Sequence, residues 1–165
     1  FIQAFNKPLR MMIIGAVHIS QALIPMAQNV GFEVTVIDPR SSFATNTRFP
    51  DVTLFDEWPD DAMEALSPDA RTAIVTLTHD PKLDDPALET ALKSEAFYIG
   101  SLGSKRTHAS RLERLTELGY SPENLARING PIGLDLGATS PAEIAVSILG
   151  EIITAKHGKL EKPGP

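Results

Sequence analysis

Residues 9–20, LRMMIIGAVHIS, constrain the fold of this chain more than any other segment. An apolar strand pattern runs into Gly15 and a polar turn, and a helical pattern follows. The next strand pattern, GFEVTVIDPR, ends at the acidic residue Asp38. This order is typical of the first βαβ unit of a dinucleotide-binding domain, in which backbone N–H groups at a helix N-terminus face a pyrophosphate.

One position departs from the nucleotide-binding pattern. The motif G-x-G-x-x-G/A corresponds to residues 15–20, GAVHIS, so Val17 stands where the second glycine is expected. That glycine lets the backbone approach the pyrophosphate closely. A lost hydrogen bond to a charged group is worth about 1.5–3 kcal/mol, which is about tenfold or more in affinity. We therefore expect a nucleotide to bind weakly or in a displaced position.

Strand and helix patterns alternate along the whole chain. The expected strands are 11–14, 34–37, 52–55, 73–77 and 96–99. The expected helices are 19–30 with Pro25 inside, 62–66, one with Asp85 as N-cap and Pro86 first, 104–118, one from Ser121-Pro122, and 141–156 behind the capping box of Ser140 and Glu143. This alternation predicts a Rossmann-like α/β fold, an open, mostly parallel sheet with helices on both faces.

Length and composition are those of one globular domain. We expect residues 1–165 to form a single domain with an N-terminal arm over about 1–9 and a flexible tail over about 157–165. The net charge of −6 argues against nucleic acid as a partner. No apolar run approaches the ~20 residues of a membrane span. The lack of Cys fits a reducing compartment, so we expect a cytoplasmic protein, and the lack of an initiator Met fits a piece of a longer chain.

In such a sheet the ligand binds beyond the carboxyl ends of the strands, where strand order reverses. This rule selects the loops 15–18, 38–40, 78–80 and 100–104. Gly15 is the tight-turn glycine, and Asp38 is placed to accept a hydrogen bond from a ribose 2′-OH. Arg40 nearby means that a ligand with a 2′-phosphate is also compatible with this turn. An ordinary strand-to-helix turn and an Asp-Pro turn explain Gly15 and Asp38 equally well.

The stretch GSLGSKR predicts a second anion-binding turn. Gly100 and Gly103 indicate a flexible turn, and Ser104 is a helix cap. Lys105 and Arg106 follow in the first helical turn, where the macrodipole disfavours each cation by about 0.3–1 kcal/mol. They either recruit an anion or are two solvated charges.

Histidines and acids at the same edge leave several roles open. His18, His79 and Asp80 could act as metal ligands or as an acid/base pair, and Asp80, Asp84 and Asp85 could bind Mg²⁺ with phosphate. The spacing contains no H-x-x-x-H, H-E-x-x-H or thiolate motif. Turn histidines bonded to backbone and acids at a helix start are the alternative. We therefore predict no metal site and assign no catalytic residue.

Six segments together resemble the XdhC/CoxI family of xanthine dehydrogenase accessory factors. They are GAVHISQAL, VIDPRSSFAT, RFP, LTHDPKLDDPAL, FYIGSLGSKRTHASRLERL and PIGLDLGATSPAEIAVSILGEI. The resemblance covers nearly the whole chain and matches the family's C-terminal Rossmann-like domain. The family's N-terminal domain has no counterpart in this sequence, and the family usually has glycine where Val17 stands.

The resemblance implies a maturation protein for molybdenum hydroxylases of the xanthine dehydrogenase type. Such proteins are thought to hold molybdenum cofactor and deliver it to a partner enzyme. The implied cofactor is molybdenum cofactor or an NAD(P)-like nucleotide. Carried over by motif, the cofactor-binding positions are Gly15, His18, Asp38, Arg40, His79, Asp80, Gly100, Gly103, Ser104, Lys105 and Arg106, with Gly133, Asp135 and Gly137 in a later turn. Val17, at the position that departs from the family, completes the predicted cofactor-binding set.

Three functional hypotheses follow. The first is a binding module that holds a phosphorylated cofactor without turning it over. The second is an NAD(P)-dependent oxidoreductase with His79 or His18 as acid/base. The third is a structural module that forms a homodimer through its edge strand or last helix.

Overall fold

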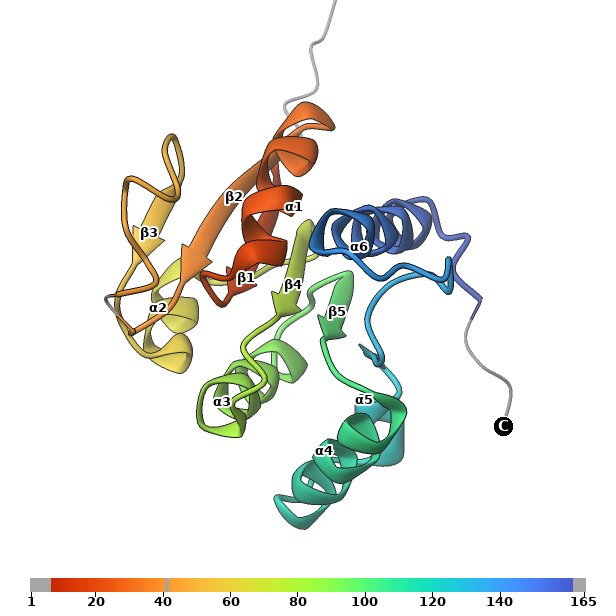
Figure 1. The fold of residues 1–165 in the computed structure, drawn as a ribbon. Helices are drawn as coiled ribbons and strands as arrows, with labels where there is room; N and C mark the ends of the chain where they lie inside the picture. Colours follow the sequence, from red (N-terminus) through yellow and green to blue (C-terminus); the bar gives the residue numbers. More distant parts are fainter. Residues whose placement is uncertain (1–6, 41, 162–165) are drawn as a thin grey trace, which may run out of the picture.

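All six strands of the structure, a computed structural model that describes residues 7–40 and 42–161, lie parallel in one sheet (Figure 1). The strand order is β3-β2-β1-β4-β5-β6. The strands are β1 (Leu9–Ile14), β2 (Phe32–Ile37), β3 (Thr53–Phe55), β4 (Thr72–Thr76), β5 (Tyr98–Ser101) and β6 (Ile128–Asn129). This is the order of dinucleotide-binding Rossmann domains, and it reverses between β1 and β4.

Helices cover both faces of the sheet, as the sequence predicts. They are α1 (His18–Asn29), α2 (Pro59–Leu66), α3 (Pro81–Leu92), α4 (Lys105–Glu117), α5 (Pro122–Leu125) and α6 (Pro141–Lys156). Helices α1 and α6 pack side by side on one face, and α2 packs against α3 on the other (Figure 1). The Rossmann-like α/β architecture is therefore confirmed.

The alternation of side chains along β1 explains the two layers. Met11 and Ile13 belong to the core cluster under α1 and α6. Met12 and Ile14 belong to the cluster under α2 and α3. All four are at most 1% exposed. A parallel strand covered on both faces has no polar side, which is why residues 11–14 read as a continuous apolar run.

Helix α3 begins earlier than the sequence analysis expects. Its N-cap is Asp80, whose Oδ1 accepts from the backbone N–H of Lys82 at 3.0 Å, and Pro86 lies inside the helix. The prediction of Asp85 as the cap is therefore wrong. The sequence offers the same Asp-Pro signal twice, at 80–81 and 85–86, and local pattern does not rank them. Asp85 instead forms an ion pair with Arg114 at 2.7 Å.

Several boundaries depend on tertiary pairing. Strand β6 was not predicted, because its two residues are too short to show a period, and it is held by pairing of Ile128 with Ile99. Leu9 lies in β1, inside the expected N-terminal arm, while residues 1–6 lie outside the described residues. Helix α6 ends at Lys156 with its Ser140 and Glu143 capping box formed, as expected. The flexible tail stays a prediction, and its residues 162–165 are not described.

Among the described residues, no helix has the length and apolar character that crossing a bilayer requires. The cytoplasmic location expected from the sequence stays a prediction.

Gly100 lies inside β5 and is buried, so its assignment to a flexible turn is wrong. A Cβ atom at this position would lie 2.6 Å from the Tyr98 hydroxyl oxygen and 2.7 Å from Ile132 Cδ1. The glycine is needed because those two side chains fill the space above the strand.

We expect Gly100→Ala to lower the free energy of unfolding by about 1–3 kcal/mol, because the added methyl overpacks the core. Chemical denaturation measures the change. Gly150→Ala in α6 is the matched control, since only the end of the flexible Leu134 side chain lies near its Cβ position. There we expect no loss, or a gain of up to about 1 kcal/mol from helix propensity. Equal losses in both variants would contradict this role of Gly100.

Candidate functional site

The loops that follow β1, β2, β4 and β5 meet at the carboxyl edge of the sheet, as expected. Helix α1 leaves β1 toward one face and α3 leaves β4 toward the other, so the strand order reverses between these two strands (Figure 1). The Gly15 N–H donates to the Ile37 carbonyl at 3.0 Å, and the Leu77 N–H donates to the Ile14 carbonyl at 2.8 Å. These bonds place the turn after β1 between the loop after β2 and the loop after β4.

Gly15 adopts a left-handed backbone conformation, with φ of +120°. A Cβ atom there would lie 3.0 Å from Thr78 Cγ2 and 3.3 Å from the carbonyl carbon of Leu77. Ser20 stands at the last glycine or alanine position of the motif, is fully buried and donates its hydroxyl to the Gly15 carbonyl. The turn after β1 is thus closely packed against the loop after β4.

The first turn of α1 faces this edge without a side-chain cap. Its N-cap is Val17, whose side chain has no acceptor and whose extended backbone (φ −116°, ψ 177°) suits valine. His18 begins the helix and is exposed. The first N–H groups of a helix lack intrahelical partners, so this end favours an anion. Val17 packs in part against the core, and its expected steric effect on a nucleotide stays a prediction.

Asp38 is fully buried, and both of its carboxylate oxygens accept hydrogen bonds from other groups of the chain. Oδ2 accepts from the Ala16 N–H at 2.9 Å and from Arg40 Nη2 at 2.7 Å, and Oδ1 accepts from Arg40 Nε at 2.9 Å. Burial alone would raise the pKa of Asp38, but these hydrogen bonds outweigh it and lower the pKa. A ribose hydroxyl reaches Asp38 only after Arg40 moves, so ribose binding there stays a prediction.

Arg48 ties the segment after β2 to the first turn of α1. Its Nη1 donates to the carbonyls of Ala16 at 3.1 Å and Phe43 at 2.8 Å. Its Nη2 donates to Gln21 Oε1 at 3.2 Å. This role of Arg48 could not be predicted from the sequence, because a single arginine in a turn-rich stretch carries no local signal for it.

The loop after β4 holds His79 in a left-handed conformation, with φ of +64°, and leaves its side chain exposed. Such backbone strain costs about 1–3 kcal/mol at a residue other than glycine and occurs most often at functional sites. The adjoining Thr78 hydroxyl donates to Asp84 Oδ1 at 2.6 Å. Within residues 7–40 and 42–161, no group of three or more His, Asp or Glu side chains is arranged to hold a metal ion.

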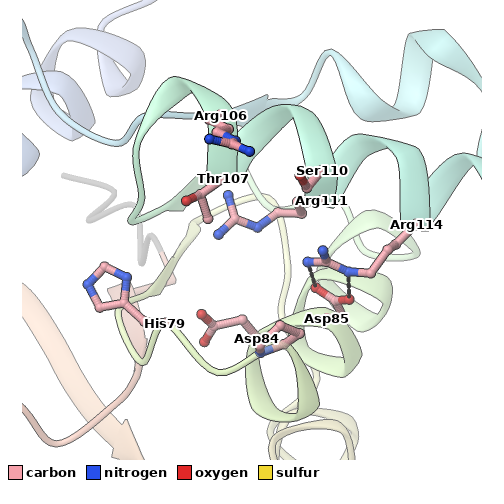
Figure 2. Close-up of a pocket in the computed structure, with 9 residues that line it drawn as sticks. His79, Asp84, Asp85, Arg106, Thr107, Ser110, Arg111 and Arg114 are labelled. Atoms are coloured by element: carbon pink, nitrogen blue, oxygen red, sulfur yellow. Dashed lines mark hydrogen bonds and ion pairs between the residues drawn. The ribbon is translucent and has the colours of Figure 1, made fainter.

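A cavity of about 250 Å³ opens between α3 and α4. Its lining includes His79, the acids Asp84 and Asp85 of α3, and three arginines of α4 (Figure 2). The arginines are Arg106, Arg111 and Arg114. Ser104 caps α4 by accepting from the Thr107 N–H at 3.1 Å, as predicted. Arg106 in the first turn borders the cavity, whereas the exposed Lys105 is not part of its lining.

Two further predicted glycines have structural contacts. Gly103 has φ of +147°, and a Cβ there would lie 2.9 Å from Thr107 Cγ2. Gly133 donates its N–H to Glu151 Oε1 at 3.2 Å, and its Cβ position is closed by Ser147. Gly133 thus packs the loop after β6 against α6, while Asp135 and Gly137 are exposed in the same loop. Cofactor contacts by all of these residues stay predictions.

A parallel sheet of this strand order, with helices on both faces, defines a Rossmann-type α/β domain. The model of the XdhC Rossmann domain family matches residues 11–152. The chain therefore belongs to that family.

Three known proteins are similar to this chain in sequence or structure. An uncharacterised protein of Escherichia coli, YqeB, is 33% identical over 99% of this chain and 31% of its own length. The E. coli molybdenum cofactor insertion chaperone PaoD is 31% identical over 94% of this chain and 43% of its own length. A Bacillus halodurans crystal structure described as a xanthine dehydrogenase superposes with a TM-score of 0.78 and 30% identity, over 96% of this chain and 45% of that one. This chain spans less than half of each of them.

We expect Arg40→Ala to lower the free energy of unfolding by about 1–3 kcal/mol near neutral pH, because it removes two donors from a buried carboxylate. The pKa of Asp38 is lowered in the folded protein, so this stabilisation is present above the ordinary Asp pKa of about 3.9 and is lost as the pH falls through the lowered value. The difference between native protein and variant should therefore shrink in acid. Urea denaturation at several pH values measures it.

Arg114→Ala is the control, because the Arg114 side chain is 39% exposed in its pair with Asp85. We expect it to cost less than about 1 kcal/mol. A loss in Arg40→Ala that is the same at neutral and acidic pH would show that Asp38 does not depend on Arg40 for its charge.

Proposed function

We propose that this domain is the cofactor-binding module of a maturation factor for molybdenum hydroxylases of the xanthine dehydrogenase type. It binds a phosphorylated cofactor, molybdenum cofactor or a nucleotide, at the carboxyl edge of the sheet and does not turn it over. The observation that carries this proposal is the first turn of α1, whose N–H groups face the reversal point without a side-chain cap.

Membership of the XdhC Rossmann domain family and the likeness to a molybdenum cofactor insertion chaperone support the choice of cofactor and partner. Binding without turnover is supported by how the chain uses its own acids. Asp38 is bonded to Arg40, Asp80 caps α3, and Asp85 pairs with Arg114. These carboxylates hold the structure together, which leaves them unsuited to proton transfer.

We expect His18→Glu to weaken cofactor binding about tenfold or more, because it places a negative charge where the phosphate would meet α1. The same charge favours the helix N-terminus, so thermal stability should stay equal or rise slightly. Isothermal titration calorimetry with NAD, NADP, FAD, GTP, CTP and molybdopterin measures the affinity. Binding of none of these by the folded native protein would overturn the proposal.

Asn29→Glu is the matched control, because it adds the same charge at the opposite end of the same helix. We expect it to leave cofactor affinity within about twofold of the native value. Equal weakening by both variants would place the cofactor away from the α1 N-terminus.

An NAD(P)-dependent oxidoreductase is the second candidate, favoured by the strand order. Val17→Gly tests whether the side chain of Val17 disfavours NAD, which the oxidoreductase would require. If Val17 holds a dinucleotide off the backbone, the variant should bind NAD about tenfold more tightly. Calorimetry on both proteins measures this, and a native affinity for NAD equal to that of the variant would refute the steric effect. A homodimer, the third hypothesis, is tested by sedimentation of the native protein.

A further inference from the structure

Two buried charged side chains face each other across the cavity between α3 and α4. Asp84 and Arg111 are each 2% exposed. Within the described structure, Asp84 Oδ2 and Arg111 Nε have no hydrogen-bond partner, and no ion pair joins the two residues. Figure 2 shows the carboxylate and the guanidinium pointing into the same space. Buried polar atoms are nearly always paired, so these two require an explanation.

The remaining atoms of both side chains fix their orientation. Asp84 Oδ1 accepts from the Thr78 hydroxyl at 2.6 Å. Arg111 Nη2 donates to the Leu102 carbonyl at 2.9 Å, and Nη1 lies 3.4 Å from His108 Nδ1. Turning either side chain toward another partner would break these bonds. A group that enters the cavity would supply the missing partners without breaking these bonds.

The charges around the cavity favour an anion. Arg114 is neutralised by Asp85, to which it donates from Nε at 2.7 Å and Nη2 at 3.2 Å. The remaining charges at the cavity are the positive charges of Arg106 and Arg111 and the negative charge of Asp84. Arg106 also lies in the first turn of α4, which holds no acidic residue. The helix dipole and two guanidinium groups thus act in the same direction.

The unpaired carboxylate oxygen selects the kind of anion. An anion can lie against Asp84 only if one proton is shared between them, because two carboxylate-like oxygens otherwise repel. A phosphate group takes up such a proton at a pH only slightly below neutral, since its second pKa is about 6. Sulfate carries none there. Burial raises the pKa of Asp84, and the Thr78 bond and the charge of Arg111 offset only part of the rise, which also favours a shared proton.

We propose that this cavity is a phosphate-binding site, in which Arg111 Nε donates to a phosphate oxygen, Arg106 neutralises the charge, and Asp84 Oδ2 shares a proton with the phosphate. The volume of about 250 Å³ accommodates a phosphate group but is below the size of ordinary drug-sized ligand pockets. The phosphate is therefore either the free ion or the end of a monoester whose remainder lies outside. This inference does not depend on which cofactor the α1 turn binds.

Calorimetry at constant ionic strength near neutral pH, with sodium phosphate, glycerol phosphate and sodium sulfate, tests the site. We expect a phosphate compound to bind the native protein about tenfold or more tightly than sulfate. Asp84→Asn supplies an amide donor to either anion, so it should remove this preference by strengthening sulfate binding. Equal binding of the three anions by the native protein, or binding of none because water alone fills the cavity, would overturn the proposal.

A second pair of variants avoids the buried residues. Arg106→Ala should weaken phosphate binding about tenfold, whereas Lys105→Ala removes the same charge from the same helical turn and should change it by less than about twofold. Equal effects would reduce the site to diffuse surface charge. Tight binding of glycerol phosphate identifies a monoester, and binding of inorganic phosphate alone identifies the free ion. If the native protein binds phosphate but none of the cofactors, this inference holds and the proposed function is overturned.

Discussion

The parallel pairing of β1 with a strand on each side is the constraint on which the rest of the structure depends. The registers place Ile14 opposite Ile37 on one side and opposite Thr76 on the other. Three strands therefore end at the same level, and the turns that follow them begin as neighbours. This is why Gly15 lies close to Thr78 and why the Ala16 N–H reaches Asp38. The site is a consequence of strand register before any side chain is considered.

The fold could be predicted because its information is local. A parallel strand buried on both faces is an unbroken apolar run, and Ser140 with Glu143 announces a helix start within four residues. Prediction failed where two local signals compete or where a segment is too short to show a period. The two Asp-Pro pairs before and within α3 are the first case, and β6 is the second. Both were decided by packing between segments distant in sequence.

The candidate site was predictable in position and not in chemistry. Sequence pattern located the turns at Gly15, Asp38 and His79, since each follows an apolar run. It did not show that Arg40 already occupies Asp38, because a bond between side chains two residues apart depends on the turn geometry. The position of Asp84 opposite Arg111 across the cavity could not be predicted either, because the two residues lie on different helices. Only the unusual cations at the start of α4 gave a local sign of that cavity.

Thr78 joins the two regions in which an anion is proposed to bind. On one side its methyl group bounds the Gly15 turn, where a Cβ would lie 3.0 Å from Thr78 Cγ2. On the other side its hydroxyl donates to Asp84 at 2.6 Å. The next residue is His79, whose left-handed backbone fixes the direction in which the loop leaves Thr78. A close-packed contact on one side of a residue and a short hydrogen bond on the other leave it little freedom, so the turn before α1 and the cavity between α3 and α4 share one rigid wall.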